Sequence, residues 1–403
     1  MHTKAVPALV GFLVLFLSLA GELSMQLYVP ALAEVAHAFG SDAATAQASL
    51  WVFLLGFGAG QLIFGPASDR FGRRPVLMIG LLLYLGATLA ILSMASMAGF
   101  TAARLVQAFG ACASFVVARA IVRDLYPLER VPAVLATITL AVALSVALAP
   151  TVGGWLTGRW GWQASFVFLA ALGSFLLLGA LFFLKESNAQ RAATPLSMAA
   201  LAGSYAQLLR APVFLRHALP LGFVYGAMMA YVCAAPFVVR DLLGITTQTL
   251  GLIFGGILSG FIIGILLSRL LVKRLGPDRL LSIGSALVLA FAAVTAAALI
   301  VWGFDLRSVV VPQVLLTLGA GLILPNAVAG AITPYGARAG LAAALVGFLQ
   351  MATGAAFGML AGVLHDGSPQ PMLALQLTAA VVAFGLFKGL RAPAPAPVNA
   401  GSA

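Results

Sequence analysis

The chain has 403 residues, of which 62% are hydrophobic and only 8% are charged. Soluble domains carry about 25% charged residues, so this composition excludes both a water-soluble fold and a disordered chain. The formal net charge of +11 would indicate nucleic acid in a soluble protein, so the positions of the bases have to be considered. Cys112 and Cys233 both lie within apolar stretches, and no disulfide framework is expected.

Twelve stretches are long and apolar enough to cross a bilayer as helices. A bilayer core of about 30 Å requires roughly 20 apolar residues in a helix, which satisfies its backbone hydrogen bonds internally. The first stretch follows Lys4 and carries Glu22 and Pro30 without an obvious cleavage site, so we interpret it as a retained span. The predicted spans are 8–29, 46–66, 75–97, 99–121, 132–156, 163–184, 214–238, 248–270, 279–302, 309–331, 339–364 and 369–390.

The basic residues divide unequally between the two ends of these spans. Seventeen lie on one side and three, Arg159, Arg240 and Arg307, on the other, with Arg104 and Arg119 inside the fourth span. Because basic residues collect in cytoplasmic loops, both termini are expected in the cytoplasm of a bacterial cell whose inner membrane holds the chain. The positive charge then faces the anionic inner leaflet, and nucleic acid is not needed as a partner.

The two sets of six spans share several features. Gly56 and Gly60 of the second span recur as Gly260 and Gly264 of the eighth. The tripeptide at 70–72 recurs at 274–276, and Pro30 and Pro236 would each mark a helix end. This duplication predicts an all-α membrane fold of two pseudo-symmetric six-helix bundles, with a binding site near the midplane between them.

The division into domains follows from these repeats. The N-terminal bundle is expected over 1–184 and the C-terminal bundle over 214–390. Between them we expect a cytoplasmic linker loop, 185–213. The Pro/Ala-rich end, 391–403, is typical of a flexible tail.

The connection between the second and third spans carries the strongest local signal. Gly65 would let the second span end close against a neighbour, and Gly72 would permit a tight turn. Asp69 can accept hydrogen bonds at a helix N-terminus or pair with an arginine, and the bases would anchor the connection at the surface. The residues concerned are Gly65, Asp69, Arg70, Gly72, Arg73 and Arg74.

This order of residues resembles the signature of the major facilitator superfamily, Gly-x-x-x-Asp-Arg-x-Gly-Arg-[Arg/Lys], and matches every specified position. Residues 104–110 and 149–154 resemble two motifs of drug/proton antiporters, with Ala108 and Ala149 in place of the usual glycines. Residues 28–32, 122–127 and 235–238 look like the Bcr/CflA-type multidrug efflux group. The resemblance covers 8–390 and implies proton-coupled efflux of small amphipathic drugs or metabolites by alternating access. It also implies conformational gating by the loop signature and by Arg123, Asp124, Pro150, Gly153 and Gly154.

The first span departs from that subgroup. Similar proteins usually carry Asp where this chain has Gln26, and an amide cannot carry a proton. Glu22 lies four residues earlier on the same helical face, and an acid at membrane depth marks a functional site. We therefore expect Glu22 to be the proton carrier. Arg104 is expected to respond to its charge and to hold the fourth span against the first, and Arg119 is a further candidate.

Polar and aromatic side chains within the spans are candidates for a substrate cavity. A lone amide in lipid is costly, which favours a cavity position for the amides. Aromatic residues, Tyr225 among them, could form the walls. The candidate substrate-binding residues are Gln26, Tyr28, Tyr231, Asn326 and Gln350.

Other chemistry has no motif in this chain. There is no Walker A sequence, so the proton gradient, without a cofactor, is the expected driving force. The histidines lie apart in expected termini and loops, and we predict neither a metal site nor an enzyme. We expect a monomer with a small-molecule substrate. Two alternatives remain: proton-symport uptake of a nutrient such as a nucleoside, and an intramembrane enzyme or receptor.

Overall fold

The computed structural model describes residues 8–127, 129–188 and 198–390. Within these residues, twelve helices are long and apolar enough to cross a membrane, which confirms the predicted fold class. The first half consists of α1 (Ala8–Gln26), η1 (Val29–Ala31), α2 (Leu32–Ala38), α3 (Ala43–Phe71), α4 (Arg73–Ile91), α5 (Met97–Leu125), α6 (Val131–Trp160) and α7 (Gln163–Phe183). After α8 (Met198–Leu209), the second half consists of α9 (Pro212–Leu243), α10 (Thr247–Leu275), α11 (Pro277–Trp302), α12 (Leu306–Ile332), η2 (Thr333–Arg338), α13 (Ala339–Val363) and α14 (Gln370–Gly389).

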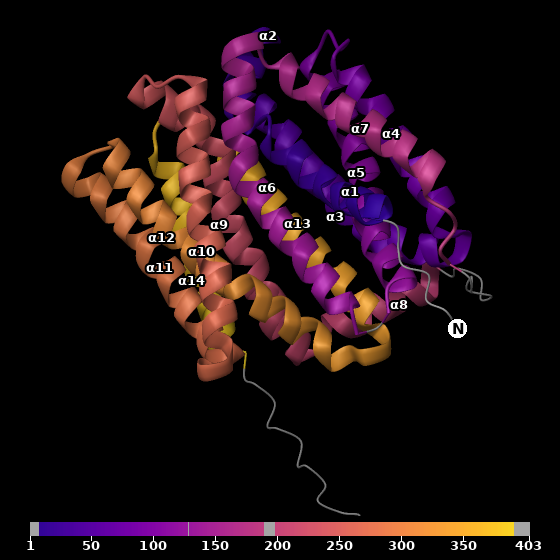
Figure 1. Cartoon of the computed structure of the whole chain (residues 1–403). Coiled ribbons are helices and arrows are strands. Elements are labelled where there is room, and N and C mark those ends of the chain that lie inside the picture. The colour runs from indigo at the N-terminus through magenta and orange to yellow at the C-terminus, as the bar shows by residue number, and fades with distance from the viewer. Residues whose placement is uncertain (1–7, 128, 189–197, 391–403) are drawn as a thin grey trace, which may run out of the picture.

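The two halves lie side by side and repeat the same helix packing (Figure 1). In the first half α3 packs on α5, and in the second half α10 packs on α12. Gly60 faces Cys112 of α5, and Gly260 faces Val314 and Thr317 of α12, so equivalent glycines serve equivalent contacts. The connections after α3 and α10 both turn at a glycine with positive φ, 101° at Gly72 and 77° at Gly276.

The prolines at 30 and 236 do not correspond as predicted. Pro30 interrupts the first span: α1 ends at Gln26, and the chain continues through η1 into α2. Pro236 instead lies inside α9, which runs on to Leu243. A transmembrane helix tolerates an internal proline when neighbouring groups satisfy the freed backbone, so the residue type alone does not mark a helix end.

The ends of the bundles can be named from the chain itself. The end that carries η1 and α2 is called the η1 end, and the opposite end, near α8, the linker end. The start of α1 lies at the linker end, because Gly11 lies against the Tyr126 hydroxyl after α5. The end of α14 also lies there, because Lys388 donates a hydrogen bond to Ser282 near the start of α11.

The predicted linker loop contains a helix, α8, which the sequence analysis missed. The Tyr205 hydroxyl of α8 donates a 3.1 Å hydrogen bond to the Leu62 carbonyl of α3 in the first half. Arg338, the last residue of η2 in the second half, donates a 2.8 Å hydrogen bond to Gln207 of α8. The helix therefore contacts both halves at the linker end.

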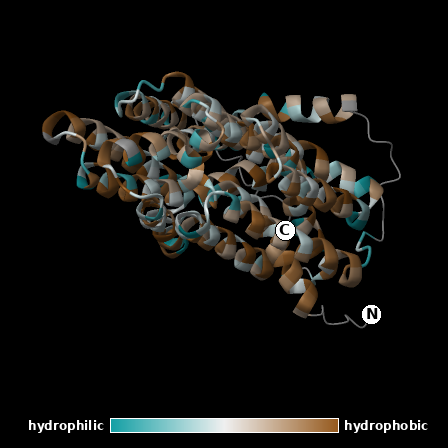
Figure 2. Ribbon diagram, turned by 90° about the horizontal axis from the view of Figure 1, so that it is seen from above, coloured by the Kyte–Doolittle hydropathy of each residue, from teal (hydrophilic) through white to brown (hydrophobic). Residues whose placement is uncertain are grey.

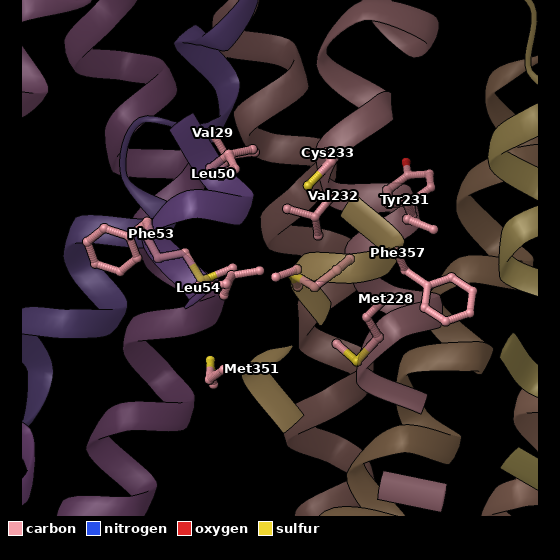
Figure 3. Close-up of a cluster of buried hydrophobic side chains, with 14 of the residues drawn as sticks. Val29, Leu50, Phe53, Leu54, Met228, Tyr231, Val232, Cys233, Met351 and Phe357 are labelled. Carbon is pink, nitrogen blue, oxygen red and sulfur yellow. The ribbon is translucent and has the colours of Figure 1, made fainter. Parts of the chain in front are cut away.

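The hydrophobic cores of the two halves meet along α3 and α13, from Gly362 beside Gln47 near the η1 end to Gly347 beside Gln61 toward the linker end. At the linker end the first half keeps a separate buried cluster around Leu13, Leu77 and Leu176. The helices also expose large apolar residues outward, as a lipid-facing surface requires, and hydrophobic colours cover most of their length (Figure 2). In the shared cluster, Val29, Leu50, Phe53 and Leu54 of the first half lie opposite Met228, Val232 and Cys233 of the second (Figure 3).

Candidate functional site

The loop signature forms a charged cluster at the linker end of the first half. The Arg73 guanidinium donates hydrogen bonds to Asp69 at 2.5 Å, to Ser68 at 2.8 Å and to Asp124 at 2.9 Å. Arg73 is buried, whereas the Asp69 side chain is 56% exposed. Of the alternatives for Asp69, the structure shows pairing with an arginine. The cluster ties the end of α3 and the end of α5 to the start of α4.

A segment of the linker, and not Asp69, accepts hydrogen bonds from the free backbone N–H groups at the N-terminus of α4. One Glu186 carboxylate oxygen accepts the Arg73 backbone N–H at 2.9 Å, and the other accepts that of Arg74 at 3.3 Å. Ser187 donates a hydrogen bond to Asp124. A carboxylate at a helix N-terminus is favourable because it pairs with free N–H groups and the helix dipole. The sequence analysis missed this contact, since Glu186 lies far along the chain from its partners.

Other residues of the signature lie differently from the prediction. The second span does not end at Gly65: α3 continues to Phe71. A Cβ at Gly65 would meet only a Val116 methyl, at 4.0 Å, so no close packing requires this glycine. Arg74 donates a 2.9 Å hydrogen bond to the Leu181 carbonyl of α7, Arg70 lies over the Phe71 ring, and Arg123 is exposed.

The Pro-Gly-Gly element of α6 lies where the two halves cross. A Cβ at Gly154 would lie 2.8 Å from the Thr247 carbonyl of α10 and 3.1 Å from the Gly251 Cα. A Cβ at Gly153 would overlap the Leu27 carbonyl, just after α1 ends. Thr151 donates a 3.2 Å hydrogen bond to the Gly251 carbonyl. Close packing is therefore present around Pro150, and its partners are α10 and the break in the first span.

A second contact joins the halves at the η1 end. The Thr247 hydroxyl at the start of α10 donates a short hydrogen bond to the Glu34 carboxylate of α2. Beside this contact lies an open hollow of about 680 Å³, lined by His37, Trp162, Phe237 and Arg240 among others. The hollow is on the outer side of the contact, so the η1 end is closed where α2 and α10 meet.

Arg104 is fully buried inside the first half. Its guanidinium lies 4.5 Å from the Tyr28 ring centre and 4.2 Å from that of Phe53. It donates hydrogen bonds to the Ser24 carbonyl at 3.0 Å and to Gln107 at 2.5 Å. As predicted, Arg104 holds α5 against α1. None of these partners is Glu22, and Nε and Nη2 have no hydrogen-bond partner among the described residues.

Glu22 faces away from Arg104, toward the region between the halves. Glu22 is half-buried and has no hydrogen bond or ion pair with the residues that the structure describes. It interacts electrostatically with Arg119 of α5 and Tyr225 of α9. Arg119 lies 4.0 Å from the Phe115 ring centre, and its side chain is exposed although it belongs to a membrane span. The expected response of Arg104 to the charge of Glu22 therefore has no direct contact in this conformation, because Arg104 lies against α1 at Ser24 and Glu22 leaves α1 on another face.

The candidate substrate residues do not lie together. Tyr28 is fully buried in the first half and hydrogen-bonds to Ser49, and Asn326 is buried in the second half, where it donates to Ser268 and the Leu322 carbonyl. In this conformation both side chains hydrogen-bond to neighbouring helices, and their role in binding substrate stays a prediction. Three candidates keep unsatisfied or half-buried polar groups: Gln26 with a buried Oε1, Tyr231 with a buried hydroxyl beside a 10 Å³ cavity, and Gln350.

Two histidines also lie differently from the prediction, since His37 lies in α2 and His217 in α9. His217 was expected in a loop, but it lies inside α9, where its ring packs over Gly330 of α12. Its Nδ1 is 2.8 Å from the Val213 carbonyl one turn earlier.

Comparison with known proteins finds a matching family and several proteins of similar sequence. The sequence profile of the Major Facilitator Superfamily matches residues 14–362. The "Uncharacterized MFS-type transporter YdgK" of Bacillus subtilis is 31% identical over 94% of each chain. A "Bicyclomycin resistance protein homolog" of Haemophilus influenzae is 27% identical over 89% of each chain, and "Multidrug resistance protein D" of Escherichia coli is 28% identical over 82% of each.

A solved structure shows the same fold. It is a bacterial homologue of the human lysosomal transporter Spinster, in an inward-facing and occupied conformation, with a TM-score of 0.76. The identity is 16%, and the match covers 96% of this chain and 97% of the other.

Proposed function

Because the chain belongs to the Major Facilitator Superfamily of membrane transporters, we propose that it exports small amphipathic drugs or metabolites in exchange for protons. It is a multi-pass protein of the bacterial inner membrane. The names of two relatives, a bicyclomycin resistance protein homolog and a multidrug resistance protein, support efflux. The proposed driving force is the proton gradient, with no cofactor, and the proposed unit is a monomer.

The observation that carries the proposal is the place of Glu22. The other ten acids lie in connections or toward the ends of helices, whereas Glu22 lies well inside the first span, between the two halves. An acid at this depth costs free energy unless it has a function. A carboxyl group there can take up a proton from one side and release it to the other. Glu22 is therefore our proton carrier.

The proposed cycle is alternating access. The base distribution places the linker end in the cytoplasm, so the contacts at Gly154 and Thr247 close the outer side. The first half keeps its own hydrophobic cluster at the linker end, and we infer that the halves separate there during the cycle, when the contacts of α8 with α3 and of α3 with α13 near Gln61 open. In the cytoplasm-open state of the cycle the transporter takes up substrate and releases a proton. Rocking of the halves then exposes the site outside, where Glu22 is protonated again.

The test uses everted vesicles with an acid lumen and a fluorescent pH probe. Bicyclomycin and chloramphenicol are added to the medium, which contacts the cytoplasmic face. An antiporter carries drug inward and protons outward, so the lumen becomes less acid. We expect this signal with the wild type, and no signal above empty vesicles with Glu22→Gln, which keeps the shape of the side chain but cannot ionise.

The matched control is Glu129→Gln, the same change at an exposed acid of a connection, and it should behave as the wild type. Glu22→Gln that still moves protons with drug would refute the role of Glu22. A drug-evoked acidification of the lumen by the wild type would instead indicate symport.

A further inference from the structure

The surroundings of Glu22 on the first half can be traced through packed rings. Gly21, the preceding residue, lies against the Phe57 ring of α3, and this ring packs on Phe115 of α5 with 5.5 Å between centres. The Arg119 guanidinium lies over the same Phe115 ring, 4.0 Å from its centre. Arg119 thus reaches the side of α1 on which Glu22 lies, from within the same half.

The second half places a hydroxyl near the same face. The Tyr225 Oη of α9 lies 3.8 Å from the Met25 sulfur of α1. Met25 follows Glu22 by three residues, and residues three apart in a helix lie on one face. A thioether is a weak acceptor, so the Tyr225 hydroxyl retains the capacity to donate to a stronger one. An ionised carboxylate one turn away is such an acceptor.

The Tyr225 ring is held in place by its own half. A Cβ at Gly354 of α13 would lie 2.7 Å from two atoms of the ring, and 3.0 Å from Met229. No side chain larger than hydrogen fits between this part of α13 and the ring. Tyr225 therefore moves with α9 and α13, while Glu22 moves with the first half.

We propose that Tyr225 is the positioning residue through which the second half responds to the charge of Glu22. When Glu22 is ionised, the Tyr225 hydroxyl turns from Met25 and donates to the carboxylate, and charge-assisted hydrogen bonds are the stronger kind. When Glu22 is protonated, this bond weakens and the two halves lose a contact. The inference rests on the proposed role of Glu22 as proton carrier.

The other charged groups around Glu22 define how large the effect of Tyr225 should be. Among the described residues, the groups that interact electrostatically with Glu22 are Arg119 of α5 and Tyr225 of α9. Arg104 and Tyr84 lie at Ser24, on the other face of α1. Removal of the Tyr225 hydroxyl should leave Arg119 as the main group that favours the ionised form.

The experiment measures drug-evoked proton movement against pH for the wild type and Tyr225→Phe. Loss of a donor to the ionised form lets Glu22 stay protonated to higher pH. We expect the midpoint of the profile to move up by about one pH unit, since a hydrogen bond to a charged group is worth about 1.5 kcal/mol or more.

The control is Tyr205→Phe, the same change in α8. The Tyr205 hydroxyl donates to the Leu62 carbonyl and does not interact with Glu22, so the midpoint should not move. A profile of Tyr225→Phe that coincides with the wild type, while Glu22→Gln abolishes proton movement, overturns the inference and leaves the proposed function standing. Proton movement that survives in Glu22→Gln overturns both.

A measurement independent of transport guards against a poorly folded variant. Thermal unfolding in detergent is compared for Tyr225→Phe and the wild type at acid and alkaline pH. The loss of stability should be larger at alkaline pH, where Glu22 is ionised, and should vanish in the Glu22→Gln background. An equal loss at both pH values would indicate packing alone and would overturn the inference.

Discussion

At the scale of single residues, two of the three arginines of α5, Arg104 and Arg119, have opposite surroundings. Arg104 is enclosed by aromatic rings and bound to the Ser24 carbonyl, whereas Arg119 is exposed and interacts with Glu22. Because its side chain is enclosed, we assign Arg104 the role of holding α1 and α5 together. Arg119 is the base whose charge acts on the proton carrier.

This difference predicts that Arg104→Lys affects stability and not coupling. An ammonium group cannot reproduce the planar contacts with Tyr28 and Phe53 or the two hydrogen bonds of the guanidinium. We expect a loss of about 2 kcal/mol in the free energy of unfolding, measured in detergent. The folded fraction should still move protons with drug. Full stability combined with lost proton movement would instead assign Arg104 to coupling, as its position in the sequence led us to expect.

The position of Glu22 could be predicted from the sequence, but its partner was predicted wrongly. An acid inside an apolar span is conspicuous because it is expensive there. The partner depends on which face of α1 the side chain leaves. Ser24, which Arg104 contacts, is two residues from Glu22 and so points about 200° away around the helix. Helical spacing becomes informative only once the structure has placed Arg104 at Ser24, and the sequence alone does not give that contact.

At the scale of elements, α6 and α10 cross through residues without side chains. Gly154 and Gly251 lie with their Cα atoms close enough that a Cβ on either would lie 3.1 Å from the other. We expect Gly154→Val to prevent this crossing and to reduce drug transport by about tenfold or more, since overpacking costs about 1–3 kcal/mol. Transport in everted vesicles, normalised to folded protein, measures the effect.

Gly158 on the same helix supplies the control for this substitution. A Cβ at Gly158 would meet its nearest neighbour, the Gln248 side chain, at 3.7 Å, which is ordinary contact. Gly158→Val should therefore transport nearly as the wild type does. Equal losses in both variants would show that the cost comes from a β-branched residue in α6 and not from the crossing.

Two contacts between elements could not be predicted from the sequence. Pro150, Gly153 and Gly154 lie at a close crossing, but the sequence does not indicate which helix approaches them. The N-terminus of α4 is a similar case. Its cap is Glu186, which α5, α6 and α7 separate from α4 along the chain. No local sequence pattern indicates so distant a partner.

At the scale of the whole molecule, the fold could be predicted and the conformation could not. Twelve apolar stretches and repeated glycines define the helices and the two halves, because hydrocarbon leaves few alternatives to a helix. The conformation depends on a few contacts between the halves, whose net free energy is small. The contact of Glu34 with Thr247 is one of these, and nothing in the spacing of the two residues indicates it.

This contact predicts how the balance between conformations can be shifted. Thr247→Val removes the hydroxyl that donates a hydrogen bond to Glu34 and nearly preserves the shape of the side chain. A hydrogen bond of about 1 kcal/mol corresponds to a change of about fivefold in the ratio of closed to open η1 ends. The open population should rise accordingly.

Spin labels on Ala38 of α2 and Gln248 of α10, both exposed, report the opening as a longer distance between the labels. The native Cys112 and Cys233 are buried and should not take up label. Thr249→Val is the matched control, because the Thr249 hydroxyl bonds to Thr246 beside it and not to the first half. Since the same bond holds the outer side closed, Thr247→Val should also weaken drug binding from the cytoplasmic side. Unchanged distances and affinity in Thr247→Val would show that other contacts, the crossing at Gly154 among them, close the η1 end without this hydrogen bond.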